Sequence, residues 1–241
     1  MPERRPTPRG KPRVVCFTAA KEGAGKSTIA LNLALAWAGT QSRNVVIVHV
    51  DPLCRNDLAF QLTLVSPSLM RLIGSPVPMS QWAVGVVPLA DTPAEARGLA
   101  PSFVAEALRG LQARYDLFLD VEPSSPLRDM AFELAGLVFW TCLPHRSHLE
   151  ATCNMFQEPK LPLDRFEVVV NAADIPGGLA LKEVQLFFAA MNKSVFCPMP
   201  WEKELPGCAN TGRILVAEQP QSDWVKALRP LLGRVMEMRP G

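Results

Sequence analysis

The residues best suited to chemistry in this chain form the run Lys21-Glu-Gly-Ala-Gly-Lys-Ser-Thr28. The run follows an apolar segment typical of a strand and precedes an Ala- and Leu-rich segment typical of a helix. Glycines let backbone N–H groups approach a phosphate closely, and the N-terminus of the following helix attracts anions. The amine of Lys26 could then reach phosphate oxygens, and the hydroxyl of Ser27 could ligate Mg²⁺. The spacing therefore predicts a loop that binds the phosphates of a nucleotide.

This loop differs from the ordinary G-x-x-x-x-G-K-[ST] pattern, because Ala20 occupies the position of the first glycine. It fits better the variant K-G-G-x-G-K-[ST], in which Lys21 supplies a second lysine. Glu22 then replaces a glycine and adds a negative charge near the polyphosphate. If this side chain faced the ligand, the repulsion would cost about 1 kcal/mol. We expect it to point to solvent or across a dimer interface.

Short apolar runs alternate with longer segments of helical periodicity from Arg13 onward. The runs that predict strands are 13–18, 44–50, 84–89, 116–121, 137–142, 166–170 and 194–197. The segments that predict helices are 27–37, 57–64, 102–113, 127–135, 147–157, 179–191 and 222–238. This alternation predicts an α/β fold: a doubly wound, mostly parallel sheet with helices on both faces. We expect one domain over residues 13–241, preceded by a flexible, basic, proline-rich tail over residues 1–12.

With these motifs the chain resembles the MinD/ParA group of P-loop ATPases, over nearly its whole length. Four segments besides the loop resemble motifs of that group: the D-x-D-P strand, the Walker B strand, the strand whose terminal Asn reads adenine, and the I-P-x-D stretch. They are Asn44–Pro52, Tyr115–Asp120, Val168–Asn171 and Met199–Glu202. Two softer motifs, Pro88–Ala96 and Gly177–Val184, resemble the CpaE/TadZ branch, whose members are ATPases of Tad-type pilus assembly.

The resemblance implies ATP and Mg²⁺ as cofactors and assigns residues to them. The residues that bind the nucleotide are then Gly23, Ala24, Gly25, Lys26, Ser27, Thr28, Asn171 and Pro200. Ser27 would ligate Mg²⁺ directly, and Asp120 would hold it through a water molecule. The alternative for Asp120 is an acid with a purely structural role.

The same resemblance implies a slow ATPase with Lys21, Lys26 and Asp51 as its catalytic residues. Lys21 would reach the nucleotide of a second subunit in a homodimer that encloses two ATP molecules. Asp51 would orient the attacking water, although a residue that caps a strand-to-loop exit is the alternative. His49 replaces the first acid of the D-x-D pair, and this change bears on turnover more than on binding.

Three functions follow from the motifs. The first is an ATP-dependent dimerising switch that localises or regulates a polar machine, such as a pilus or secretion apparatus, through a protein partner. The second is a DNA-partition ATPase, which needs a concentrated basic face; here the basic residues are scattered and the net charge is only +2. The third is a degenerate scaffold that binds ATP with little hydrolysis. A metal-cluster enzyme of the nitrogenase-reductase kind is disfavoured, since Asp120–Ser125 contains no cysteine.

Composition limits where the protein acts. Hydrophobic residues make up 48% of the chain, enough for a sizeable core, and no run reaches the roughly eighteen apolar residues that a membrane helix needs. The six cysteines show no C-x-x-C pair, so we expect free thiols in a reducing cytoplasm. Segment 223–238 is basic and amphipathic, and we favour its packing on the core over membrane binding. Contact with anionic membranes should be weak and peripheral.

Overall fold

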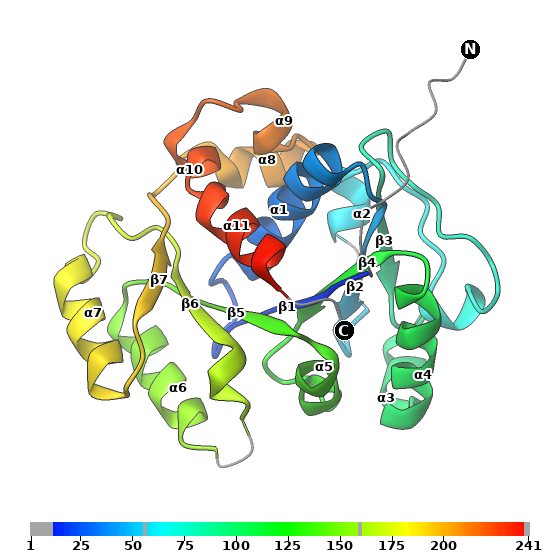
Figure 1. The fold of residues 1–241 in the computed structure, drawn as a ribbon, viewed down its shortest axis with the longest axis horizontal. Coiled ribbons are helices and arrows are strands. Elements are labelled where there is room, and N and C mark those ends of the chain that lie inside the picture. Colours follow the sequence, from blue (N-terminus) through cyan, green and yellow to red (C-terminus); the bar gives the residue numbers. More distant parts are fainter. Residues whose placement is uncertain (1–11, 55–56, 159–160, 239–241) are drawn as a thin grey trace.

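The computed structural model describes residues 12–54, 57–158 and 161–238, which fold around one parallel sheet (Figure 1). Within these residues the sheet has seven strands in the order β3-β2-β4-β1-β5-β6-β7. The strands are β1 (Val14–Thr18), β2 (Val45–Val50), β3 (Val84–Pro88), β4 (Asp116–Val121), β5 (Leu137–Cys142), β6 (Phe166–Val170) and β7 (Val195–Pro198). Every residue of β1 to β5 is buried, which explains why these runs are apolar without alternation. The predicted doubly wound fold is confirmed.

Helices cover both faces of the sheet, as Figure 1 shows. The layer above the sheet in that view contains α1 (Lys26–Gln41), α2 (Asp57–Gln61), α8 (Leu205–Thr211), α9 (Leu215–Glu218), α10 (Asp223–Lys226) and α11 (Leu228–Glu237). The layer below contains α3 (Pro93–Gly98), α4 (Pro101–Gln112), α5 (Arg128–Leu134), α6 (Arg146–Phe156) and α7 (Leu181–Ala190). Two 3₁₀ turns, Leu69–Arg71 and Leu163–Arg165, complete the described elements. Each layer closes its own buried apolar cluster against the sheet.

The observed elements match the predicted ones closely, with three short helices as the exceptions. Each strand begins and ends within one residue of its predicted bounds, and α1 continues to Gln41 instead of ending at Trp37. Helices α3, α8 and α9, of 6, 7 and 4 residues, were not predicted. Elements this short show too few turns for an apolar periodicity to be recognised. The predicted tail lies outside the described residues except for Pro12.

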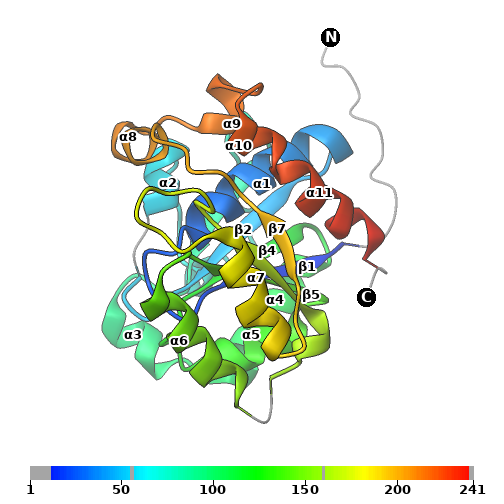
Figure 2. The same ribbon diagram turned by 90° about the vertical axis from the view of Figure 1, so that its left-hand side faces the viewer.

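The C-terminal segment packs on the core, as predicted. In Figure 2, α10 and α11 lie alongside α1. The side chains of Trp224, Leu228, Leu231 and Val235 are fully buried there, so the apolar face of this segment is already covered. Pro230 lies in the first turn of α11, where its missing N–H breaks no helical hydrogen bond. Among the described residues, no helix has the length and apolar character that crossing a bilayer requires.

A buried acid ties the central strands to α1. Asp116 begins β4 and is fully buried. Its Oδ2 accepts a hydrogen bond from Trp37 Nε1 at 2.9 Å and pairs with Arg43 Nε at 2.8 Å. Its Oδ1 accepts a hydrogen bond from the backbone N–H of Arg13 at 2.7 Å. These partners satisfy a charge that would otherwise be costly to bury.

Parallel strands bring their carboxyl ends to one edge of the sheet, and in doubly wound folds ligands bind at this edge. The loop after β1, Asp51 after β2, Asp120 near the end of β4 and Asn171 after β6 all lie there. The fold thus brings together segments that are more than 140 residues apart in the chain; Asn171 and Ala24, for example, are 147 residues apart.

Candidate nucleotide site

Glycines shape the loop between β1 and α1. Gly23 and Gly25 have φ angles of +79° and +88°, in the left-handed region that favours glycine. Gly25 also caps the N-terminus of α1, and within the described residues no side chain caps this end. Glu22 is not among the described non-glycine residues with a positive φ, so its presence adds no backbone strain. The loop therefore keeps the two left-handed glycines that a phosphate loop needs, and Glu22 does not disturb them.

Lys26, the first residue of α1, is held between two carboxylates. Its Nζ lies 2.6 Å from Oε1 of Glu122 and 3.4 Å from Oδ1 of Asp120. Lys26, Asp120 and Glu122 are all buried. Burial alone would lower the pKa of Lys26, but the charges of Asp120 and Glu122 outweigh burial and raise this pKa. The amine is therefore a fixed positive charge at the base of the loop.

Asp120 lies beside His49 on the neighbouring strand. The two residues are in register across β2 and β4, and His49 Nε2 is 3.3 Å from Asp120 Oδ2. Both side chains are buried. Asp120 thus contacts Lys26 through one carboxylate oxygen and His49 through the other. The histidine occupies the position of an expected acid and adds a neutral or positive group beside the remaining carboxylate.

Asp51 follows β2 directly and is buried at the pocket wall. Its Oδ1 accepts a hydrogen bond from the backbone N–H of Leu53 at 2.8 Å, and its carbonyl accepts one from Cys54. These bonds form the turn that leaves the strand. Asp51 therefore caps the exit from β2, as the structural alternative expects. It also lies at the pocket, where a residue that orients the attacking water would have to be.

Asn171 joins the end of β6 to the phosphate loop. Its Nδ2 donates a hydrogen bond to the carbonyl of Ala24 at 3.0 Å, while its buried Oδ1 has no hydrogen-bond partner among the described residues. A Cβ on Gly25 would lie 2.3 Å from Asn171 Nδ2, so only glycine fits here. Pro200 lies two residues beyond β7, where hydrogen bonds from Met199 to Val170 and from Ala173 to Met199 hold its segment beside Asn171.

Lys21 is exposed at the start of the loop. It lies close enough to the first turn of α6 to affect His148, whose pKa is lowered by burial and further by the charges of Lys21 and His145. Glu22 is exposed as well. Glu22 nevertheless lines the pocket beside the loop, and its orientation away from a ligand stays a prediction.

One pocket of about 330 Å³ brings most of these residues together. It is lined by Glu22, Gly23, Gly25, Lys26, Ser27, Thr28, His49, Asp51, Asp57, Leu58 and Glu122. Of the predicted site residues, Lys21, Ala24, Asp120, Asn171 and Pro200 do not line it. Asp57, Leu58 and Glu122 were missed. Glu122 could have been found, because it follows Asp120 by two residues on the same face of an extended segment.

The donors around this pocket suit a magnesium nucleotide. The Ser27 hydroxyl and the carboxylates of Asp51 and Asp120 offer the oxygen ligands that Mg²⁺ prefers. Within the described ranges, no three His, Cys, Asp or Glu side chains form a cluster able to hold a metal by themselves. Mg²⁺ usually completes its octahedron with water and substrate phosphates, so the residues fit a metal that arrives with the nucleotide.

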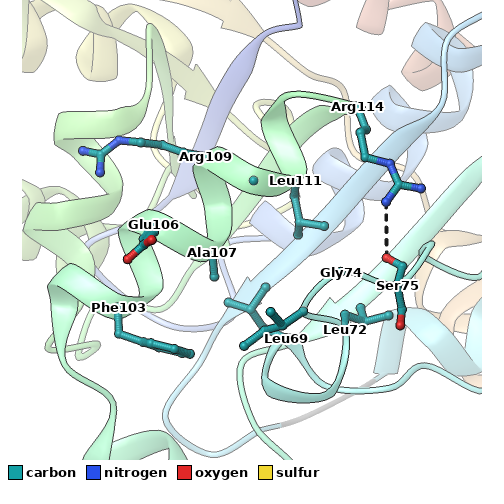
Figure 3. Close-up of a pocket in the computed structure, with 12 residues that line it drawn as sticks. Leu69, Leu72, Gly74, Ser75, Phe103, Glu106, Ala107, Arg109, Leu111 and Arg114 are labelled. Carbon is teal, nitrogen blue, oxygen red and sulfur yellow. Dashed lines mark hydrogen bonds between the residues drawn. The ribbon is translucent and has the colours of Figure 1, made fainter.

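A larger groove of about 740 Å³ lies elsewhere, between α4 and segment 69–75 (Figure 3). Leu69, Leu72 and Phe103 form part of its apolar lining, and Arg114 donates a hydrogen bond to the Ser75 carbonyl at its rim. It contains none of the loop residues. The predicted phosphate-binding residues therefore belong to the smaller pocket.

No family model matches this sequence, and no curated protein matches it. The fold, in contrast, has clear counterparts among solved structures. A ParA-family ATPase from Chlorobium tepidum shares 18% identity, with a TM-score of 0.73 and coverage of 95% of this chain and 99% of its own. MinD from Pyrococcus furiosus shares 20%, with a TM-score of 0.74 and coverage of 93% and 98%. MinD from Pyrococcus horikoshii, complexed with Mg-ADP, shares 19%, with a TM-score of 0.73 and coverage of 93% and 96%.

The chain has the fold of the MinD/ParA ATPases. At these identities the likeness establishes the fold alone. Each comparison covers at least 93% of this chain, so the shared fold extends over nearly its whole length.

Proposed function

We propose that this protein is an ATPase of the MinD/ParA type that binds Mg-ATP in the pocket at the N-terminus of α1. The observation that carries the proposal is the buried Lys26 beneath a two-glycine loop, with Asp51, Asp120 and the Ser27 hydroxyl beside it. Lys26 would bind the β- and γ-phosphates, and backbone amides of the loop would bind the remaining phosphate oxygens. Bound Mg²⁺ would neutralise charge on the phosphates during hydrolysis.

Each residue then has a task in hydrolysis. Ser27 and Asp120 would hold the metal, and Asp51 would orient the water that attacks the γ-phosphorus. The bond from that phosphorus to the bridging oxygen breaks, leaving ADP and phosphate. Asn171 and Pro200 would bind the base at the ends of β6 and β7, where the buried Asn171 Oδ1 offers an acceptor.

We also propose that the protein dimerises on ATP. Lys21 is exposed at the mouth of the loop, as a residue that reaches a second subunit must be. A cation delivered to the partner's nucleotide would neutralise phosphate charge only while the triphosphate is present. Dimer formation would thereby report the state of the nucleotide, and slow hydrolysis would reset it.

The partner and location are proposed from the family resemblance. MinD from Aquifex aeolicus forms a complex with MinC, and this chain shares 16% identity with that structure. By analogy, a protein partner of a pilus or secretion machine, as in the CpaE/TadZ branch, would bind the ATP dimer here. A cytoplasmic location is supported by the cysteines, all six of which are free thiols and four of which are buried.

The binding proposal is tested by calorimetric titration of the protein with Mg-ATP. The wild type should bind, and Lys26→Ala should bind at least about tenfold more weakly, because it loses a charge-assisted contact to the phosphates. Lys226→Ala is the matched control, since this lysine pairs with Asp223 on α10, outside the pocket. Equal affinity in the wild type and Lys26→Ala would contradict the assignment of the pocket.

A further inference from the structure

Among the described residues of the nucleotide pocket, Lys26 and Glu122 form the shortest ion pair. The Nζ to Oε1 distance is 2.6 Å, whereas Asp120 stands at 3.4 Å. The side chains of Lys26 and Glu122 are 8% and 9% exposed, so little water screens their attraction. Glu122 also lines the pocket itself. The carboxylate of Glu122 is thus paired with the Lys26 amine, which binds phosphate in the proposed function.

A phosphate that binds Lys26 must compete with the oxygens that its amine already contacts. The ammonium group has three N–H donors, and Nζ lies 2.6 Å from Glu122 Oε1, 3.3 Å from Ser27 Oγ and 3.4 Å from Asp120 Oδ1. If Glu122 stayed in place, it would face the incoming phosphates in a poorly solvated site, where like charges repel strongly. Phosphate binding therefore requires the carboxylate of Glu122 to move away from Lys26.

Backbone hydrogen bonds hold Glu122 between β4 and α5. Its N–H bonds to the carbonyl of Val50 at 3.3 Å, and its own carbonyl accepts a hydrogen bond from Ser125 at 3.0 Å. Ser125 in turn holds the start of α5, through Leu127 and Arg128. The backbone of Glu122 is thus fixed at the start of the turn over residues 122–127 that joins β4 to α5, and only its side chain has to move.

We propose that Glu122 is an internal competitor of the nucleotide, which occupies Lys26 in the free protein and must be exchanged for phosphate when Mg-ATP binds. The inference rests on the proposed function, because it takes Lys26 as the phosphate-binding amine. It assigns to Glu122 a role that the family resemblance did not give it. The residue thereby sets the affinity for nucleotide.

The test compares Mg-ATP affinity in the wild type and Glu122→Gln by calorimetric titration. The glutamine keeps the shape of the side chain but loses its charge, so it competes less well for Lys26. Mg-ATP should then bind about tenfold more tightly, the change expected when the hydrogen bond that must be broken is no longer formed between two charged groups. Equal or weaker binding by Glu122→Gln would overturn the inference.

Glu167→Gln provides a matched control. Glu167 forms an ion pair of the same length, 2.6 Å, with Arg234, but it lies on β6 outside the pocket. This variant should keep the wild-type affinity for Mg-ATP. If both variants bound Mg-ATP more tightly by the same factor, the effect would reflect a general loosening of the fold. That result would contradict the proposed competition between Glu122 and the nucleotide.

A second measurement uses only the wild type, so that it holds even if Glu122→Gln folds poorly. In a crystal structure with Mg²⁺ and a non-hydrolysable ATP analogue, Lys26 should contact phosphate, and the Glu122 carboxylate should lie beyond ion-pair distance of its Nζ. A retained Lys26–Glu122 contact beside bound phosphate would overturn the inference. If neither the wild type nor Glu122→Gln binds Mg-ATP, the proposed function itself fails; if both bind equally, only the role of Glu122 fails.

Discussion

Gly25 and Gly23 share a left-handed backbone but have different surroundings. A Cβ on Gly25 would lie 2.3 Å from Asn171 Nδ2, whereas nothing lies within 4 Å of one on Gly23. Alanine at either position strains the backbone by about 1 kcal/mol. We predict that Gly25→Ala lowers the free energy of unfolding by about 2–3 kcal/mol, because the collision adds to the strain.

Gly23→Ala should lose only the stability that the backbone strain costs, so it serves as the control when both variants are unfolded in urea. Mg-ATP binding, measured on the same samples, should fall more in Gly25→Ala, because Asn171 would have to withdraw from the loop. Equal losses of stability in the two variants would mean that the Asn171 side chain moves away at no cost and does not stabilise the loop.

The pocket residues that belong to a short sequence motif or follow a clear strand could be predicted from the sequence. Lys26, Ser27 and Thr28 lie in one contiguous motif, and Asp51 follows an apolar strand, so each could be placed from sequence. Glu122 could be seen in the sequence, but its bond to Lys26 depends on how β4 lies beside the start of α1. Contacts between residues 96 positions apart, as here, are set by tertiary packing and leave little local signal.

Elements with several turns or with unbroken apolar runs were predicted accurately, because burial on both faces leaves a clear composition. The short helices α3, α8 and α9 were not, since their order comes from caps and neighbours. Thr92, for instance, accepts a hydrogen bond from the N–H of Glu95 and so begins α3. Such capping signals are single residues, and many similar ones in the chain begin no helix.

The packing of α11 allows a quantitative prediction of stability. Leu231 is fully buried against the layer that contains α1, whereas Met236 on the same helix is 45% exposed. We expect Leu231→Ala to lower the free energy of unfolding by about 2–5 kcal/mol, as the loss of a buried leucine usually does. Met236→Ala should change it by less than about 0.5 kcal/mol.

Chemical unfolding followed by circular dichroism measures both variants. The result also separates packing from membrane binding for the C-terminal segment. A negligible effect of Leu231→Ala would mean that α11 is not part of the folded core. It would then favour the alternative that this segment binds membranes.

At the scale of the whole molecule, we predict a dimer that depends on the nucleotide. The exposed Lys21 should act on the nucleotide of the other subunit, so Lys21→Ala should bind Mg-ATP nearly as the wild type does but remain monomeric. Asp51→Ala should dimerise with ATP and fail to hydrolyse it, because the attacking water is no longer oriented. Each subunit would supply the same residue across a two-fold axis, as closed dimers require.

The most direct measurement of this switch is light scattering after size exclusion, with Mg-ATP and with Mg-ADP, for the wild type and both variants. We expect a dimer mass for the wild type with ATP and a monomer mass with ADP. We also expect a monomer for Lys21→Ala with either nucleotide and a lasting ATP dimer for Asp51→Ala. The same wild-type mass with ATP and with ADP would rule out the nucleotide-dependent dimer and favour a scaffold that binds ATP without switching.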